Sequence, residues 1–199
     1  MIEEARKITK AKVAFFYCKY NDTARNTFVA VARGVLSQLL RQNRDLLPFF
    51  YERSSASGEV TLSSLTLAKE LLKVALNSVE KVYVILDGID ECSRDDRKDI
   101  SSFFCGIVED LPQANFDSIH CLFVSQDDGF ARKDFTKCSA LKIDANDNKT
   151  DIHNLVRVWS ERLQQRFELT DDRKSEIWDQ VSRGADGRLL VGKYFSYID

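Results

Sequence analysis

Three acidic residues with the spacing of a chemical site lie close together in this chain of 199 residues: Asp87, Asp90 and Glu91. They follow an apolar run, Val82 to Leu86, and Gly88 lies between the first acid and the other two. Carboxylates packed this closely repel one another, and a hard cation such as Mg²⁺ with bound phosphate relieves the repulsion. The pattern therefore indicates a magnesium and phosphate site. The same residues are also compatible with a buried strand that simply ends in a solvated acidic turn.

A strand is the element that must position these acids. The uninterrupted run of β-branched, aromatic and aliphatic residues from Val82 to Leu86 is typical of a parallel sheet that helices cover on both faces. Ligands of open α/β sheets bind beyond the carboxyl ends of the strands, and Asp87 falls at that point. Gly88 permits a tight turn and leaves room beside the carboxylates.

The remaining sequence alternates between strand and helix patterns. Three further strands are predicted, at Val13–Tyr17, Cys121–Val124 and Ala140–Ile143. Apolar residues at three- and four-residue spacing predict helices over residues 23 to 46, after Thr61, after the charged run 94 to 98, after the turn at 146 to 150, and after Thr170. We expect Pro48 to end the first of these helices, residues 54 to 58 to form a loop, and the charged run to be a solvated first turn. This alternation predicts an α/β fold with a parallel sheet.

Composition excludes several classes of protein. The chain is 44% hydrophobic, and its 29 basic and 31 acidic residues give a formal charge of −2 with the signs interleaved. That balance predicts neither a nucleic-acid partner nor a membrane partner. The chain has no apolar run of membrane-spanning length and no secretory signal, so we expect a soluble cytoplasmic protein. Five widely spaced cysteines are best interpreted as buried free thiols in a reducing compartment.

The stretch from Lys81 to Cys92 resembles the Walker B segment of the NACHT family of signalling NTPases, which belongs to the STAND class of P-loop NTPases. The shared pattern is a hydrophobic run, then Asp, a small residue, a hydrophobic residue, Asp and Glu. Residues 13 to 47 are similar to the segment before Walker B in the fungal type of NACHT protein, whose amino-terminal domain is described as nephrocystin-3-like. The resemblance covers roughly residues 1 to 187.

This resemblance implies a role for each acid. Asp87 would hold Mg²⁺ through water, while Asp90 and Glu91 would polarise the water that attacks the nucleotide. Ser125 and Gln126 occupy the strand end that senses the γ-phosphate in the family. An arginine often follows the serine there, and Gln126 cannot supply its charge.

The family also requires a phosphate-binding loop, Gly-x-x-x-x-Gly-Lys-[Ser/Thr], ahead of the Walker B strand. No such sequence precedes residue 81, and the near match from Gly187 to Lys193 continues with Tyr194 in place of the hydroxyl that binds Mg²⁺. We therefore expect a truncated domain. Residues 1 to 187 would form an incomplete three-layer P-loop NTPase fold, with a parallel sheet of about four strands, flanking helices and no central Walker A strand. Residues 188 to 199 would be a divergent tail.

Two functions remain open from the sequence. The first is a fragment of a NACHT-type ATPase or GTPase, whose full-length form uses Mg²⁺ and ATP or GTP. By itself the fragment is expected to bind nucleotide with Mg²⁺ weakly or not at all, because the missing loop supplies most phosphate contacts. The second is a non-catalytic protein-interaction module, or a truncated gene product without function. The expected partners are a second copy or a NACHT-family protein. Full-length relatives are expected to carry ankyrin or other repeats, which this sequence lacks.

Overall fold

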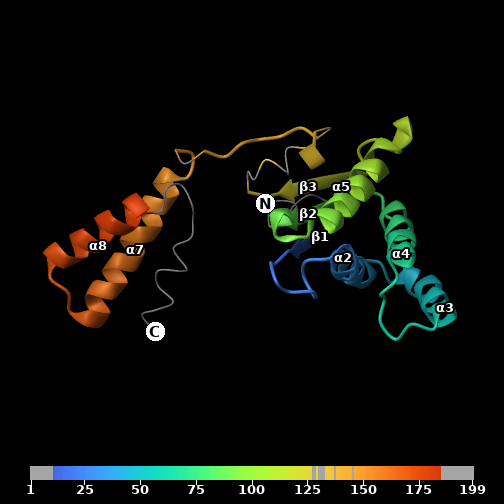
Figure 1. Ribbon diagram of the computed structural model, residues 1–199, viewed down its shortest axis with the longest axis horizontal. Helices are drawn as coiled ribbons and strands as arrows, with labels where there is room; N and C mark the ends of the chain where they lie inside the picture. Colours follow the sequence, from blue (N-terminus) through green and yellow to red (C-terminus); the bar gives the residue numbers. More distant parts are fainter. Residues whose placement is uncertain (1–10, 127–128, 130–132, 137, 145, 185–199) are drawn as a thin grey trace. The chain divides into compact units, whose positions relative to one another are not determined.

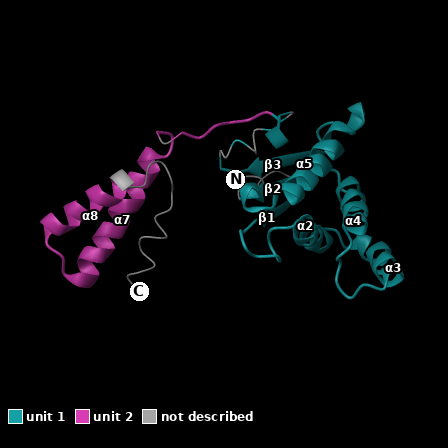
Figure 2. Ribbon diagram, viewed as in Figure 1, with its two compact units in different colours: residues 1–138 teal, residues 139–199 magenta. Residues whose placement is uncertain are grey.

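The chain forms two compact units, Met1–Cys138 and Ser139–Asp199 (Figure 2). The computed structural model describes residues 11–126, 129, 133–136, 138–144 and 146–184. The described residues of the second unit include two helices packed on each other, α7 (Lys149–Phe167) and α8 (Asp171–Gly184). The predicted boundary at residue 187, the tail after it and the near match from 187 to 193 lie outside the described residues. None of the described helices combines the length and the apolar character needed to cross a bilayer.

The first unit is built on a parallel sheet, as predicted. Its described strands are β1 (Lys12–Tyr17), β2 (Val82–Asp87) and β3 (Ile119–Val124), in the order β1-β2-β3 (Figure 1). The pairing runs without a break, so that Tyr17, Asp87 and Val124 lie side by side at the carboxyl ends of the three strands. The last residue of β2 therefore sits at the middle of this edge.

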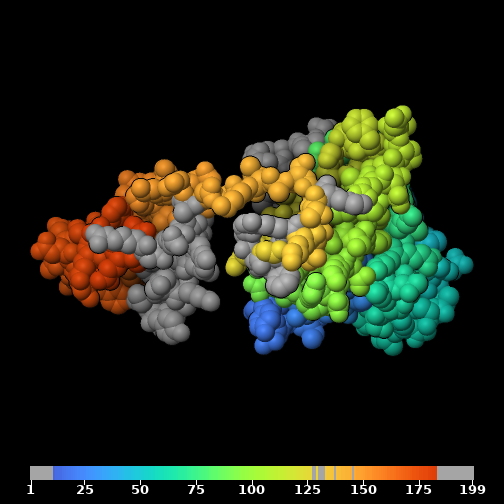
Figure 3. All heavy atoms as spheres, turned by 45° about the horizontal axis from the view of Figure 1, so that its top comes forward, coloured from blue at the N-terminus to red at the C-terminus, as the bar shows by residue number. Residues whose placement is uncertain are grey.

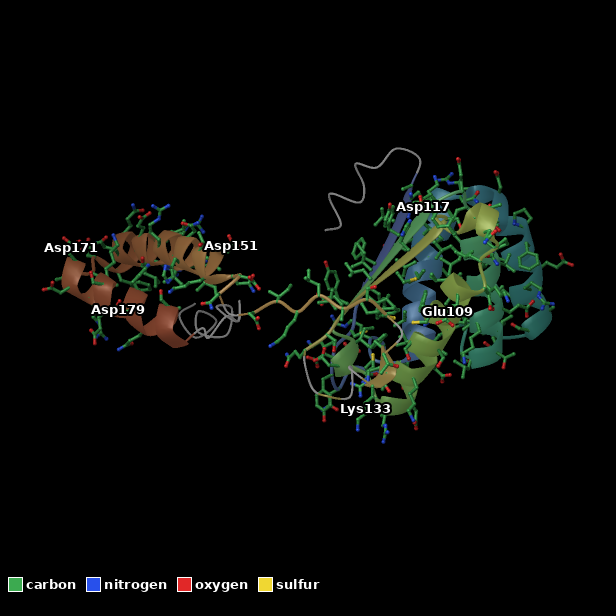
Figure 4. All side chains as sticks on the ribbon, turned by 90° about the horizontal axis from the view of Figure 1, so that it is seen from above. Glu109, Asp117, Lys133, Asp151, Asp171 and Asp179 are labelled. Atoms are coloured by element: carbon green, nitrogen blue, oxygen red, sulfur yellow. The ribbon has the colours of Figure 1, made fainter. Side chains whose placement is uncertain are left out.

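Helices return the chain between the strands. They are α2 (Phe28–Gln42), α3 (Leu47–Ser57), α4 (Leu65–Asn77) and α5 (Arg94–Glu109), with short 3₁₀ turns η1 (Arg44–Leu46), η2 (Ile89–Glu91) and η3 (Gln113–Asn115). Figure 4 shows α2, α4 and α5 on the same side of the strands. Their buried side chains pack on alternate strand residues, in a core that includes Ala14, Phe28, Leu72, Val84, Leu86 and Phe104.

The opposite face of the sheet carries a smaller apolar cluster around Val13 and Ile85. The described helices of this unit thus form one layer on the sheet, where the sequence predicted helices on both faces. The predicted α/β class is confirmed, while a third layer is not among the described elements.

The prediction of a fourth strand at Ala140–Ile143 is wrong. This segment is irregular in the structure, and the side chains of Leu141 and Ile143 are 90% and 64% exposed. A run this short becomes a strand only when a neighbour pairs with its backbone, and it pairs with no strand among the described residues. The described sheet accordingly has three strands where about four were expected.

The prediction that Pro48 ends a helix is also wrong, because Pro48 lies near the start of the next helix. Pro48 lies in the first turn of α3, where its missing N–H is not needed and its fixed φ angle suits a helix. The helix continues through the predicted loop to Ser57, and Gly58 ends it in the left-handed conformation with φ 69°. Pro48 therefore lies in the first turn of α3 and does not mark the end of a helix.

Two glutamines of α2 cover the outer edge of β1. The side-chain oxygen of Gln38 accepts a hydrogen bond from Phe15 N at 3.1 Å, and its amide nitrogen donates to Phe15 O at 2.7 Å. Gln42, one turn later, makes the same pair of bonds to Val13 at 3.2 and 2.8 Å. These amides satisfy backbone groups that a further strand would otherwise use, which protects an exposed sheet edge from pairing with other chains.

Gly34 allows α2 to approach β1 closely. A Cβ atom at this position would lie only 2.4 Å from Cδ2 and 2.7 Å from Cε2 of the Phe16 ring. Gly106, in α5, is a matched contrast because a Cβ there would meet nothing within 4 Å.

We predict opposite effects for the same substitution at these two glycines. Gly34→Ala should lower the free energy of unfolding by about 1–3 kcal/mol, because the added methyl displaces a packed ring. Gly106→Ala should raise it by roughly 0.5–1 kcal/mol, because alanine loses less backbone entropy in a helix. Urea unfolding of both variants measures the difference. Equal stabilisation by the two substitutions would mean that the Phe16 ring moves aside without cost.

Candidate functional site

The acidic turn begins where β2 ends, and main-chain bonds fix it on both sides. The carbonyl of Asp87 accepts a hydrogen bond from Cys18 N at 2.8 Å, in the segment that follows β1. The next amide, Gly88 N, donates to the carbonyl of Val124 at 3.0 Å, at the end of β3. The position of the turn is therefore set by both neighbouring strands.

Gly88 is required at the start of this turn for two reasons. Its backbone is left-handed, with φ 73° and ψ 38°, a conformation that side chains disfavour. A Cβ atom here would also lie 3.2 Å from the carbonyl oxygen of Cys18. The chain then enters η2, whose Ile89 is fully buried and anchors the turn in the core. As a result, Asp87, Asp90 and Glu91 all stand half-buried at the edge of the sheet.

Two of the acids hold the neighbouring loops. Asp90 Oδ1 accepts a hydrogen bond from Gln126 N at 3.0 Å, and Glu91 Oε2 accepts one from Tyr20 N at 3.0 Å. Ser125 Oγ in turn donates to the carbonyl of Gln126 at 2.9 Å. The structure thus brings the five residues predicted from the sequence to one edge, and it gives Asp90 and Glu91 a structural role that the sequence did not indicate.

Asp87 differs from the other two acids. Its carboxylate has no hydrogen-bond or ion-pair partner in the part of the chain that the structure describes. Mg²⁺ usually takes one or two protein carboxylates and completes its shell with water and substrate phosphates. Asp87 is suited to be one of these carboxylate ligands, because its oxygens are not taken up by a protein partner among the described residues.

The described residues contain no group of three or more His, Cys, Asp or Glu side chains arranged to hold a metal ion. An all-protein cage of the kind that binds structural zinc therefore does not fit this part of the molecule. A cation at the acidic turn would depend on oxygen ligands from a bound phosphate compound and from water.

A pair of thiols lies beside the turn. Cys18 and Cys92 are hydrogen-bonded to each other, which raises the pKa of Cys18, with burial adding to the effect, and lowers the pKa of Cys92. Cys18 follows a strand and Cys92 follows the acidic turn in the sequence. Because they are 74 positions apart, the sequence did not indicate that they contact each other. All five cysteines are thiols and not disulfides, as predicted, but the prediction that they are buried is right only for Cys92, because the other four are partly exposed.

The charged run at the start of α5 is not a simple solvated turn. The Arg97 side chain is 5% exposed and pairs with Asp134 at 2.9 Å. Asp96 Oδ1 accepts a hydrogen bond from Phe28 N at 2.9 Å, so it satisfies an amide at the start of α2. Ser93 Oγ donates to the other oxygen of Asp96 at 2.7 Å. This run therefore joins α5 to two other parts of the first unit.

A cavity of about 590 Å³ lies at the other end of the sheet. It is lined by residues that precede β2, among them Val79 and Glu80, and by residues that precede β3, among them Asn115 and Ser118. Asp117, labelled in Figure 4, marks the same end of β3. Because the acidic turn follows the carboxyl end of β2, this cavity is not part of the candidate site.

Two substitutions at Asp90 test whether its carboxylate holds the Gln126 amide. Asp90→Ala should speed hydrogen exchange at the Gln126 amide by roughly three- to tenfold, the equivalent of one lost hydrogen bond. Asp90→Asn keeps an oxygen in place and should leave that rate nearly unchanged. NMR-detected exchange at Gln126, with Tyr20 as an internal reference, measures both. Equal acceleration by the two variants would show that the carboxylate does not hold this amide.

The profile of the family described as Nephrocystin 3, N-terminal, matches residues 1–126, which include the three described strands and the acidic turn and extend to Gln126. No curated protein and no solved structure matches the chain.

Proposed function

The chain belongs to the nephrocystin 3 N-terminal family, and from this membership and the geometry of the acidic turn we propose that it carries the Walker B half of a NACHT-type nucleotide-hydrolysing site. The proposal rests on the position of Asp87 and on its carboxylate, which is unpartnered in the described part of the chain. It stands half-buried at the carboxyl end of the central strand, without a partner among the described residues, beside two further acids. Ligands of open α/β sheets bind at this edge.

The three acids divide the work. Asp87 would hold a magnesium ion through water, and that ion would supply positive charge to the nucleotide phosphates. Asp90 and Glu91 polarise the attacking water. Each uses one oxygen to hold a loop amide, and a carboxylate has further lone pairs for a second partner. Those loop bonds orient the two carboxylates before any ligand arrives.

The arrangement of the strands supports this assignment. In the described residues β3 pairs only with β2, on one side. In the NACHT fold, the strand that leads into the phosphate loop would pair with the other side of the strand that corresponds to β3. Residues 1–199 contain no complete Gly-x-x-x-x-Gly-Lys-[Ser/Thr] sequence. We therefore expect this chain by itself to bind nucleotide weakly, because that loop makes most of the phosphate contacts.

The role of Asp87 can be tested on the chain as it stands. Mn²⁺, a paramagnetic substitute for Mg²⁺, should broaden the NMR signals of Asp87, Gly88 and Asp90 selectively when it is titrated together with ATP or GTP. Asp87→Asn should abolish this broadening, because the amide is a poor ligand for a hard cation. Asp95→Asn, at an exposed acid in the first turn of α5, should not. Broadening that persists in Asp87→Asn would contradict the proposal.

A test of the role of Glu91 requires a phosphate loop in the same polypeptide. In such a fusion, Glu91→Gln should lower kcat by about 10²-fold or more and change nucleotide affinity little, because an amide cannot take up a proton. The substitution keeps an oxygen that can accept from Tyr20 N, so lost activity would not reflect a displaced loop. Asp95→Asn again serves as the control. Unchanged turnover in Glu91→Gln would remove Glu91 from the mechanism.

A further inference from the structure

A second pair of thiols lies away from the acidic turn. Cys105, on α5, and Cys138, at the end of the first unit, have their sulfur atoms 3.3 Å apart although they are separated by 33 positions in the chain. Both side chains are partly exposed. Figure 3 shows the described residues that follow β3 at the surface of the first unit, beside α5.

Three contacts hold the segment that carries Cys138 in place. Asp134 pairs with Arg97 of α5 at 2.9 Å, and both side chains are largely buried, 11% and 5% exposed. The Phe135 ring packs against Phe123 of β3, with 4.6 Å between ring centroids. Cys138 N donates a hydrogen bond to the carbonyl of Phe135 at 3.0 Å. The thiols are therefore brought together by the fold and not by nearness in sequence.

We propose that Cys105 and Cys138 form an oxidation site, a thiol pair that a peroxide converts into an intramolecular disulfide and that a thiol reductant restores. The sulfur atoms are already in contact at 3.3 Å, and a bond of about 2.05 Å requires them to approach by about 1.25 Å. This proposal does not rest on the nucleotide site. It adds a covalent modification site to a part of the molecule that the acidic turn does not reach.

The reaction balances with one peroxide molecule. The thiolate of one cysteine attacks a peroxide oxygen, the O–O bond breaks, and a sulfenic acid forms while hydroxide leaves and is protonated to water. The second thiolate then attacks the sulfenic sulfur. The S–S bond forms, the S–O bond breaks, and the departing hydroxide takes up a proton to give a second water. Two electrons pass from the two sulfurs to the peroxide.

The other thiols of the chain are less suited to this reaction. Burial raises the pKa of the neighbouring Cys121 to about 12, with Cys105 and Cys138 adding to the rise. Because only the thiolate attacks peroxide or disulfide, Cys121 should remain unreacted. Cys92, in the pair beside the acidic turn, is only 7% exposed.

The test uses the 199-residue protein, hydrogen peroxide, and alkylation of the remaining thiols before digestion. Trypsin releases residues 99–132, which contain both Cys105 and Cys121, and residues 138–142. A second cut after Glu109 separates Cys105 from Cys121. The expected result is simultaneous loss of alkylation at Cys105 and Cys138, a disulfide that joins residues 99–109 to residues 138–142, and full recovery of both thiols with dithiothreitol.

Variants and an unfolded control sharpen the result. Cys121→Ser should form the same disulfide. Cys138→Ser should instead leave a sulfenic acid on Cys105, which dimedone traps, because the resolving thiol is gone. In concentrated urea the preference for this pair should disappear. A link from Cys105 to Cys121, disulfides between separate chains, independent oxidation of the two cysteines, or the same preference in urea would each overturn the proposal.

Discussion

The parallel pairing of β2 with a strand on each side determines where the other parts of the first unit have to lie. Parallel strands cannot be joined by tight hairpins, so each connection must cross the sheet through a helix and return the chain to the same end. The carboxyl ends of β1, β2 and β3 consequently meet at one edge, with Asp87 between Tyr17 and Val124. Main-chain bonds from Cys18 and Gly88 continue this pairing past the strands and hold the acidic turn rigidly.

Polar side chains complete the backbone hydrogen bonding that the sheet and helices leave open. Gln38 and Gln42 bond to the outer edge of β1, and Asp96 accepts from the first amide of α2. Asp90 and Glu91 do the same for the loops after β3 and β1. The bonds to β1 and α2 are part-buried, where leaving a buried amide or carbonyl unsatisfied costs roughly 1–3 kcal/mol. The bonds of Asp90 and Glu91 are exposed and fix the loops at the edge of the sheet. Among the three acids of the turn, Asp87 is the one whose carboxylate these bonds leave available for a ligand.

The cysteines show how the fold places residues that lie far apart in the sequence. Cys18 meets Cys92 beside the acidic turn, and Cys105 meets Cys138 where the segment after β3 folds back on α5. The second meeting depends on the largely buried pair of Arg97 and Asp134. Removing one partner of a buried ion pair is costly, which keeps this segment on the helix and the two sulfurs in contact.

The sequence by itself determined the α/β class, the central strand and the acidic turn, because an uninterrupted apolar run followed by Asp, Gly and two more acids has few other structural solutions. The family resemblance indicated that Ser125 and Gln126 belong to the same site as the acids. Only the tertiary structure decided that Ala140–Ile143 is not a strand, that Pro48 begins a helix, and that Arg97 is buried. The physical reason is common to all three. A short apolar run, a proline or a charged side chain is compatible with several local conformations, and the choice among them depends on neighbours that are distant in the chain.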